Sequence, residues 1–208
     1  ESALELVRKK PYDVALLDFK MPGMDGLTLY REIRKLRSET VSLIVTAYAS
    51  SETQAAARDA GAFEILSKPV DFSQLFPLVE QAINQPLILV IDDDQALCET
   101  LWDLFRERGY RVAWAYDGQI AKDRLTEKDF QVVLIDMKLP KGNGSSVLLQ
   151  VKQSNPDANT ILITGYRTEM EAQIQNALTE GANAVCYKPF DVPQLLKTVE
   201  DLSQQKEK

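Results

Sequence analysis

Five polar residues in the second half of the chain follow apolar runs of the kind that form buried strands. They are Asp92, Asp93, Asp136, Thr164 and Lys188. The acidic pair follows the run LILVI, and the other three residues follow VVLI, ILI and AVCY, respectively. Parallel strands place ligand-binding residues beyond their carboxyl ends. We therefore expect these five side chains to lie close together at one edge of a sheet.

Each of these residues has an ordinary explanation when it is considered alone. An Asp after a strand commonly caps the next helix or forms a turn, a Thr can cap a helix too, and a Lys at such an edge is often only solvated. Three carboxylates within a few ångströms, however, repel one another strongly and need cations nearby. Mg²⁺ (or Mn²⁺) binds oxygen ligands, and together with the ammonium of Lys188 it would balance the three negative charges.

This combination of residues suits phosphoryl transfer. Asp136 would attack phosphorus as a nucleophile and form an acyl phosphate. The oxygens of the phosphoryl group would then be met by the metal, the ammonium of Lys188 and the hydroxyl of Thr164. The sequence contains no histidine, which excludes an imidazole of this chain as base, metal ligand or phosphocarrier.

Composition narrows the classes of function. The 208 residues are 45% hydrophobic and 26% charged, which is ordinary for a globular chain with one large domain or two small ones. The formal charge is −7 and there is no basic run, so we expect no direct nucleic acid partner. No apolar run reaches the ~18 residues of a membrane span. No signal-peptide pattern opens the chain, so we expect a cytoplasmic location.

The chain repeats itself, which indicates two related domains. Residues of the first copy precede their equivalents by 118 or 120 positions: Asp18 precedes Asp136, Thr46 precedes Thr164, and Lys68 precedes Lys188. We place the domains at residues 1–85 and 86–208. The candidate site residues of the first copy are therefore Asp18, Thr46 and Lys68.

The first copy is predicted to be truncated. Residues 87–118 of the second copy have no counterpart before Glu1, so the first copy lacks its initial β-α-β segment together with the acidic pair. Either the native protein supplies the equivalent residues upstream, or another chain donates such a segment by swapping. We favour the upstream segment.

Strand-like and helical patterns alternate in the second copy, which predicts an α/β fold with a parallel sheet. The expected strands are residues 87–91, 110–115, 132–135, 161–163 and 184–187. Four of them are continuous apolar runs, as expected when helices cover both faces of the sheet. Residues 110–115 alternate in character, which favours an edge strand.

The motifs at these strand ends resemble the receiver domain of two-component response regulators. The resemblance spans nearly all of residues 87–206 and rests on Asp92-Asp93, on IDMKLPKGNG with Asp136, on ITG with Thr164 and on YKPF with Lys188. The first copy has LLDFKMPGMDG, IVTAY and ILSKPV at the equivalent places. The resemblance implies a flavodoxin-like, doubly wound parallel sheet of five strands in the order 2-1-3-4-5, present in two copies.

The same resemblance implies roles for individual residues. Asp136, and Asp18 in the first copy, would accept a phosphoryl group from a histidine kinase or a histidine phosphotransfer protein. Asp93 and Asp136 would bind Mg²⁺ with the main-chain carbonyl of Lys138, and Asp92 would assist through water. The protein would act in phosphorelay signalling, without enzymatic activity beyond its own phosphorylation and dephosphorylation.

The resemblance also implies two features of the main chain near the site. Lys188-Pro189 would be a cis peptide bond. Gly144 would close the loop that follows Asp136.

One position departs from the family pattern. Receivers commonly have an aromatic residue three positions before the lysine, which acts as a rotameric switch with the threonine. Here those positions hold Ile65 and Val185, while Phe63 and Tyr187 lie two residues away on the same strand faces. The aromatic part of the switch is therefore in doubt.

Other functions fit the sequence less well. Phosphatases related to haloacid dehalogenases need a second Asp two residues after the nucleophile, where this chain has Lys20 and Lys138. Dinucleotide binding would need a G-x-G-x-x-G motif, which is absent from the sequence. The serious alternative is a non-phosphorylated tandem receiver scaffold for dimerisation or partner docking. A homodimer would use the face formed by residues 168–180, 184–187 and 192–203.

Overall fold

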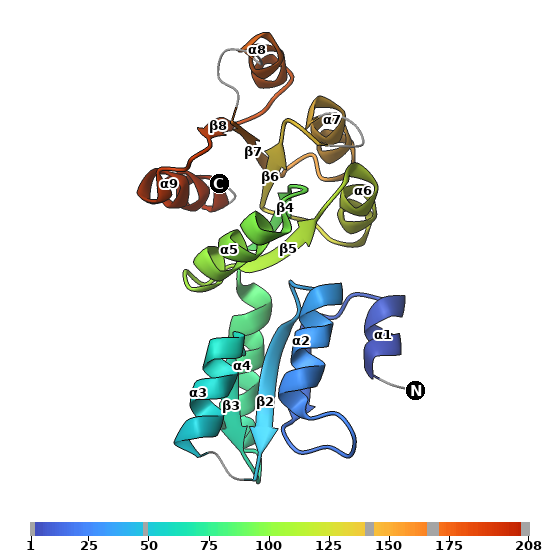
Figure 1. Ribbon diagram of the computed structural model, residues 1–208, viewed down its shortest axis with the longest axis vertical. Coiled ribbons are helices and arrows are strands. Elements are labelled where there is room, and N and C mark those ends of the chain that lie inside the picture. The colour runs from blue at the N-terminus through green and yellow to red at the C-terminus, as the bar shows by residue number, and fades with distance from the viewer. Residues whose placement is uncertain (1–2, 48–49, 140–143, 166–170, 205–208) are drawn as a thin grey trace. The chain divides into compact units, whose positions relative to one another are not determined.

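The computed structural model describes residues 3–47, 50–139, 144–165 and 171–204. The chain divides into two compact units, Glu1–Gln85 and Pro86–Lys208. Each unit is an α/β structure with a parallel sheet (Figure 1).

The second unit contains a five-stranded parallel sheet. Its strands are β4 (Leu87–Ile91), β5 (Arg111–Ala115), β6 (Val132–Asp136), β7 (Asn159–Thr164) and β8 (Ala184–Tyr187). They lie in the order β5-β4-β6-β7-β8, so β4 and β6 are neighbours at the centre and β5 and β8 form the edges. Numbered within the unit, this order is 2-1-3-4-5. Residues 110–115 of the sequence therefore contain an edge strand, as expected.

Helices cover both faces of this sheet, which explains why its central strands consist mainly of apolar residues. The helices are α5 (Gln95–Arg106), α6 (Gly118–Glu127), α7 (Gly144–Ser154), α8 (Glu171–Thr179) and α9 (Val192–Ser203). Phe105 of α5 and Val199 of α9 belong to the core on one face. Leu125 of α6, Leu148 of α7 and Ala177 of α8 belong to the core on the other. Figure 1 shows this division, with α5 and α9 on one side of the strands and α6 and α7 on the other.

The first unit contains a three-stranded parallel sheet. Its elements are α1 (Ala3–Lys9), β1 (Val14–Asp18), α2 (Gly26–Leu36), β2 (Val41–Thr46), α3 (Ser51–Ala60), β3 (Glu64–Ser67) and α4 (Phe72–Asn84), with strand order β1-β2-β3. Tyr30 of α2 and Ala57 of α3 pack in the core on one face, and Leu75 of α4 packs on the other. These three strands correspond to β6, β7 and β8 of the second unit.

The two units differ at the strand that ends in the candidate acceptor. In the second unit, β6 pairs with both β4 and β7. In the first unit, β1 pairs with β2, and the described residues contain no strand equivalent to β4. Leu16 of β1 is consequently 50% exposed, whereas its equivalent Leu134 is fully buried.

Acidic side chains cap most of the helices next to the sheets. Asp94, Asp117 and Asp191 accept hydrogen bonds from main-chain N–H groups at the starts of α5, α6 and α9. Asp25 and Asp71 do the same for α2 and α4. Such caps pair donors that the first helical turn leaves without partners.

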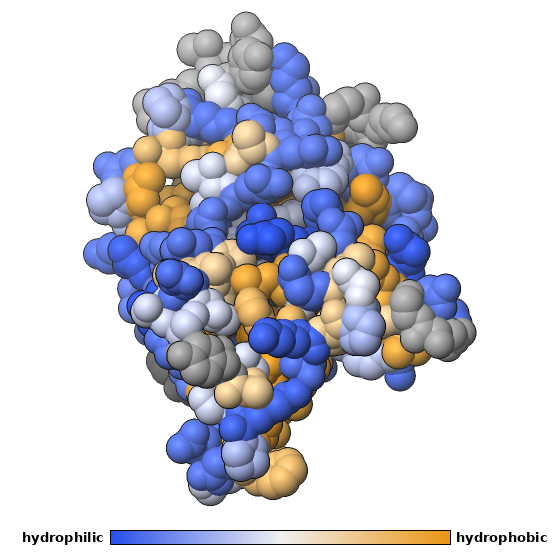
Figure 2. All heavy atoms as spheres, turned by 60° about the horizontal axis from the view of Figure 1, so that its bottom comes forward, coloured by the Kyte–Doolittle hydropathy of each residue, from blue (hydrophilic) through white to orange (hydrophobic). Residues whose placement is uncertain are grey.

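Hydrophilic residues predominate on the face of the molecule drawn in Figure 2, where apolar residues reach the surface in separate patches. Phe72 and Phe76 of α4 are exposed and stack with ring centroids 5.7 Å apart. Trp102 and Trp114, in contrast, are buried and pack edge to face. Within the described ranges, no helix has the length and apolarity that crossing a membrane requires.

Candidate functional site

The polar residues that end the strands of the second unit come together at one edge of the sheet. Asp136 is the last residue of β6 and Thr164 the last residue of β7, while Asp92 and Lys188 directly follow β4 and β8. Asp92 and Thr164 are fully buried, and Asp136 is 7% exposed. The parallel register of these strands therefore places these residues at the same end of the sheet, as expected.

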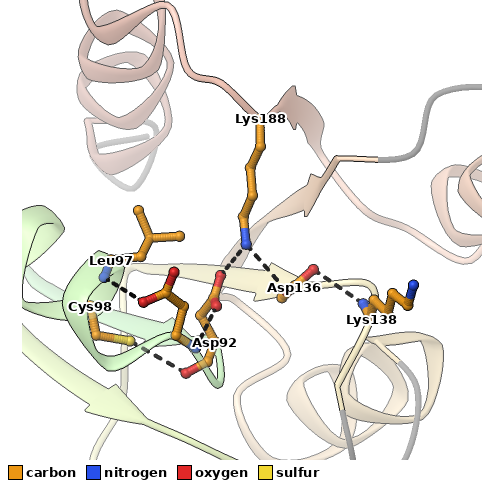
Figure 3. Close-up of polar contacts among 7 residues, drawn as sticks. Asp92, Leu97, Cys98, Asp136, Lys138 and Lys188 are labelled. Atoms are coloured by element: carbon orange, nitrogen blue, oxygen red, sulfur yellow. Dashed lines mark hydrogen bonds and ion pairs between the residues drawn. The ribbon is translucent and has the colours of Figure 1, made fainter.

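Lys188 connects two of the acidic residues. Its Nζ lies 2.6 Å from Oδ2 of Asp92 and 3.2 Å from Oδ2 of Asp136. Figure 3 shows the lysine side chain extending from the end of β8 toward both carboxylates. One ammonium thus pairs with two carboxylates that come from different strands.

Asp92, Asp93 and Asp136 form a group of potential metal ligands. Each offers a carboxylate oxygen, and these three oxygens lie within 4.8 Å of one another. Hard oxygen donors at this spacing fit Mg²⁺ or Mn²⁺, which bind one or two carboxylates and keep several waters. With Lys188 included, three negative charges face one positive charge, so a divalent cation would neutralise the group.

Burial and neighbouring charges shift the ionisation of the site. Burial raises the pKa of Asp136 above its ordinary value of 3.8, and the charge of Asp92 adds to that effect against the opposing influence of Lys138 and Lys188. Burial disfavours the ammonium of Lys188, but its hydrogen bond to Asp92 and the nearby carboxylate charges outweigh this and raise its pKa above 10.5. A charged lysine therefore lies beside a carboxylate whose ionised form is disfavoured by burial.

Lys138 and Gly144, which follow β6, make main-chain contacts at the end of that strand. Oδ1 of Asp136 accepts a hydrogen bond from the main-chain N–H of Lys138 at 3.1 Å, and the N–H of Gly144 donates to the carbonyl of Met137 at 3.3 Å. A Cβ atom on Gly144 would lie 2.7 Å from Cα of Met137 and 2.8 Å from the carbonyl oxygen of Asp136. The expectation that Gly144 closes this loop agrees with these contacts. Pro140 and the following residues 141–143 (KGN) lie outside the described residues.

Neither residue of the acidic pair is the cap of the next helix, because a third residue has that position. Asp94 accepts from the N–H of Leu97 at 3.1 Å and is the N-cap of α5. Its own N–H donates to Oδ1 of Asp92 at 3.0 Å. Asp92 thus forms a turn with one carboxylate oxygen, while its other oxygen accepts from Lys188. The position of Asp94 directly before the helical pattern was a signal in the sequence that could have identified the cap.

A thiol beneath the acidic pair was not foreseen from the sequence. Sγ of the buried Cys98 donates to the main-chain carbonyl of Asp92 at 3.4 Å (Figure 3). Burial, together with the charges of Asp92 and Asp94, raises the pKa of Cys98 to about 12. The thiol therefore stays protonated. Cys98 and Cys186 are both free thiols.

The first unit repeats part of this geometry around Asp18. Nζ of Lys68 lies 2.5 Å from Oδ2 of Asp18, and the N–H of Lys20 donates to Oδ1 at 3.1 Å. Both side chains of the pair are more than a third exposed. The hydrogen bond from Lys68 lowers the pKa of Asp18, which makes this carboxylate less strained than Asp136. Among the described residues, no acidic pair lies beside Asp18.

The main chain beside both lysines has the same form. Lys188-Pro189 is a cis peptide bond, as expected, and Lys68-Pro69 is cis as well.

Val185, at the position of the usual aromatic switch, packs against the core on the α6, α7 and α8 face. Tyr187 ends β8 and is partly buried.

Comparison with known proteins finds similarity along most of the chain. The family model described as the response regulator receiver domain matches residues 1–80 and 88–200. A response regulator receiver protein of Anaeromyxobacter sp. (strain Fw109-5) is 28% identical over 206 residues, covering 99% of this chain and 83% of that protein. The transcriptional regulatory protein ZraR of Salmonella typhimurium is 36% identical over 113 residues. That match covers 54% of this chain but only 25% of ZraR.

Solved structures show the same architecture. A CheY-like response regulator receiver domain of Methanospirillum hungatei JF-1 has a TM-score of 0.55 at 27% identity, covering 60% of this chain and 98% of that chain. A response regulator protein of Burkholderia pseudomallei, solved with a phosphorylated aspartic acid, a calcium ion and citrate, has a TM-score of 0.51 at 25% identity, covering 60% and 76%. The fold is therefore flavodoxin-like α/β, as predicted.

The family assignment rests on agreement between sequence and structure. Two matches to one family model account for the internal repeat, and the strand-end residues of the second unit meet in three dimensions. Receiver domains function in signalling rather than as general catalysts, and they interact with histidine kinases or phosphotransfer proteins. The chain belongs to the response regulator receiver domain family.

Proposed function

We propose that the second unit accepts a phosphoryl group on Asp136 from a phosphohistidine of a histidine kinase or a histidine phosphotransfer protein. The supporting observation is the grouping of Asp92, Asp93 and Asp136 within 4.8 Å, with Lys188 paired to two of them. Such an arrangement is costly for folding unless a cation and a ligand use it. The related protein with a phosphorylated aspartic acid and a calcium ion supports the same assignment.

In the proposed reaction, a carboxylate oxygen of Asp136 attacks phosphorus in line with the bond to the donor imidazole. The P–N bond breaks, the imidazole nitrogen takes a proton, and an acyl phosphate remains on Asp136. Lys188 would neutralise one phosphoryl oxygen, and the hydroxyl of Thr164 would donate a hydrogen bond to another. Later attack by water on phosphorus would release phosphate and restore the carboxylate.

The metal would be held by the acidic residues of the same edge. We assign Asp93 and Asp136 as direct ligands with the main-chain carbonyl of Lys138, and Asp92 as a partner that acts through water. When bound, Mg²⁺ supplies positive charge to the phosphoryl oxygens as the transition state develops. Asp92, which is fully buried and bonded to Lys188, keeps the lysine in position.

We propose Asp18 as the equivalent acceptor of the first unit. Lys68 and Lys20 contact Asp18 as Lys188 and Lys138 contact Asp136, and Thr46 ends β2 as Thr164 ends β7. The reaction at Asp18 would require an acidic pair beside it. We therefore expect Asp136 to be phosphorylated in this chain in preference to Asp18.

We further propose that α8, β8 and α9 form the face through which two copies associate after phosphorylation. The strand β8 lies at the edge of the sheet, and all four of its residues are partly exposed. Residues 168–170 of the expected face lie outside the described residues. Light scattering during size-exclusion chromatography, with and without a phosphoryl mimic, tests this association.

Beryllofluoride, which imitates an aspartyl phosphate, tests the proposed function. With Mg²⁺ it should raise the melting temperature of the second unit, because a ligand that binds only the folded state stabilises it. Neither component alone should have the full effect, and Asp136→Asn should abolish it while Asp18→Asn should not. If wild-type protein does not respond, the alternative of a non-phosphorylated scaffold for dimerisation or docking is correct.

A further inference from the structure

Cys98 occupies a place where its thiol can act on the metal site without touching the metal. It lies in the first turn of α5, four residues after the N-cap Asp94, and its side chain is completely buried. Its Sγ donates a hydrogen bond to the main-chain carbonyl oxygen of Asp92 at 3.4 Å. Figure 3 shows the thiol directed toward the main-chain oxygen of Asp92.

The other polar groups of Asp92 have partners from elsewhere in the unit. Its N–H donates to the carbonyl of Ala115 at 3.1 Å. Its two carboxylate oxygens accept from the N–H of Asp94 at 3.0 Å and from Lys188 at 2.6 Å. The thiol of Cys98 is the hydrogen-bond partner of the remaining polar group, the main-chain carbonyl oxygen of Asp92.

That carbonyl belongs to the peptide group that joins the two acidic residues. A peptide group is planar, so fixing the direction of the Asp92 carbonyl also fixes the direction of the Asp93 N–H and the start of the Asp93 main chain. The Asp93 side chain is itself exposed. Its direction toward Asp136 consequently depends on the main chain from which it extends.

We propose that Cys98 is a positioning residue of the metal site, whose thiol orients the Asp92–Asp93 peptide group and thereby directs the Asp93 carboxylate toward Asp136. This inference rests on the proposed function, because it assigns Cys98 to the same site. The thiol suits the place because it packs in the apolar cluster with Val90 and Leu101 and still offers one donor.

Three substitutions separate the hydrogen bond from packing. Cys98→Val fills the space without a donor, Cys98→Ala removes both, and Cys98→Ser keeps a hydroxyl donor. The matched control is Val199→Ala, which removes methyl groups from the same cluster on α9, away from the loop. Circular dichroism confirms that each variant is folded before metal binding is measured.

Mn²⁺ binding to the full chain, followed by the electron paramagnetic resonance signal of the free ion, is the first readout. Because a thiol is a weak donor, we expect Cys98→Val and Cys98→Ala to weaken Mn²⁺ binding by about threefold. Cys98→Ser should stay within about twofold of wild type, since a hydroxyl restores the bond. Val199→Ala should be less stable than wild type but should bind Mn²⁺ equally well.

The amide resonance of Asp93 in an NMR spectrum is the second readout, because it reports the orientation of the peptide group without metal. It should shift in Cys98→Val and stay in place in Val199→Ala. The positioning role would be overturned if Cys98→Val bound Mn²⁺ as tightly as wild type and its Asp93 amide resonance were unshifted. It would also be overturned if Val199→Ala bound Mn²⁺ more weakly in proportion to its loss of stability. Absence of Mn²⁺ binding in the wild type would instead overturn the proposed function.

Discussion

The ammonium of Lys188 lies 2.6 Å from Oδ2 of Asp92, a residue with no exposed surface. The lysine therefore supports the fold as well as the site, because a buried carboxylate without a partner is strongly destabilising. In the first unit the equivalent lysine, Lys68, pairs only with the exposed Asp18 among the described carboxylates. The two equivalent lysines thus pair with a buried carboxylate in the second unit and with a solvent-accessible one in the first.

Replacing Lys188 by Met should destabilise the second unit by about 2–3 kcal/mol, because Asp92 loses its cation inside the protein. Urea denaturation followed by the fluorescence of Trp102 and Trp114 measures the change. Lys68→Met is the matched control, and it should leave stability nearly unchanged because solvent screens that pair. Equal stability of Lys188→Met and wild type would contradict this account of the pair.

The contribution of Lys188 to the stability of the second unit should decrease at alkaline pH. Its pKa is raised above 10.5 in the folded state, so its stabilising effect is fully present below pH 10.5 and is lost as the pH rises through the raised value. The stability difference between wild type and Lys188→Met should be constant from about pH 7 to pH 9 and should narrow above about pH 10.5. Denaturation midpoints across this range provide the measurement, and a difference that narrows near neutral pH would refute it.

Asp136→Asn should stabilise the metal-free protein by roughly 1 kcal/mol at neutral pH, because it removes a buried charge close to Asp92. The pKa of Asp136 is raised above 3.8, so the wild type loses stability as the pH rises from 3.8 through the raised value. Wild type and Asp136→Asn should differ little in stability below pH 3.8, where the carboxyl group of Asp136 is protonated. Urea titrations in EDTA at several pH values measure the difference, and a less stable Asp136→Asn at neutral pH would speak against strain at this carboxylate.

Gly144→Ala should cost about 1–3 kcal/mol, because the added Cβ would meet the main chain of Met137 and Asp136 at less than 3 Å. It should also weaken Mn²⁺ binding, since the loop that contains Lys138 has to move. Gly165→Ala is a suitable control because a Cβ there meets no atom within 4 Å. Equal effects of the two substitutions on melting temperature would show that the close approach is unimportant.

The sequence predicted which end of the sheet carries the polar residues, because the strand pattern that determines it is local. An apolar run followed by an acidic residue identifies a strand and the end at which ligands bind, and β4 covers the same residues as the expected strand 87–91. The repeat of Asp18 and Lys68 as Asp136 and Lys188 predicted two related Asp–Lys pairs, and both pairs are in contact.

Other features depend on packing between distant residues, which the sequence pattern does not contain. The preference of Lys188 for Asp92 over Asp136 depends on the direction of a side chain that is 96 positions away from its partner. The bond from Cys98 to the Asp92 carbonyl depends on how deeply α5 packs against the sheet. Both contacts become visible only when the elements are assembled.

Chemical trapping of the acyl phosphate tests the central claim most directly. The chain would be incubated with Mg²⁺ and acetyl phosphate and reduced with borohydride, which converts an aspartyl phosphate to homoserine, and its peptides would be analysed by mass spectrometry. We predict homoserine at position 136 in a reaction that requires Mg²⁺ and is absent from Asp136→Asn. Homoserine at another aspartate in the second unit, or none in the wild type, would contradict the assignment of Asp136 as the acceptor.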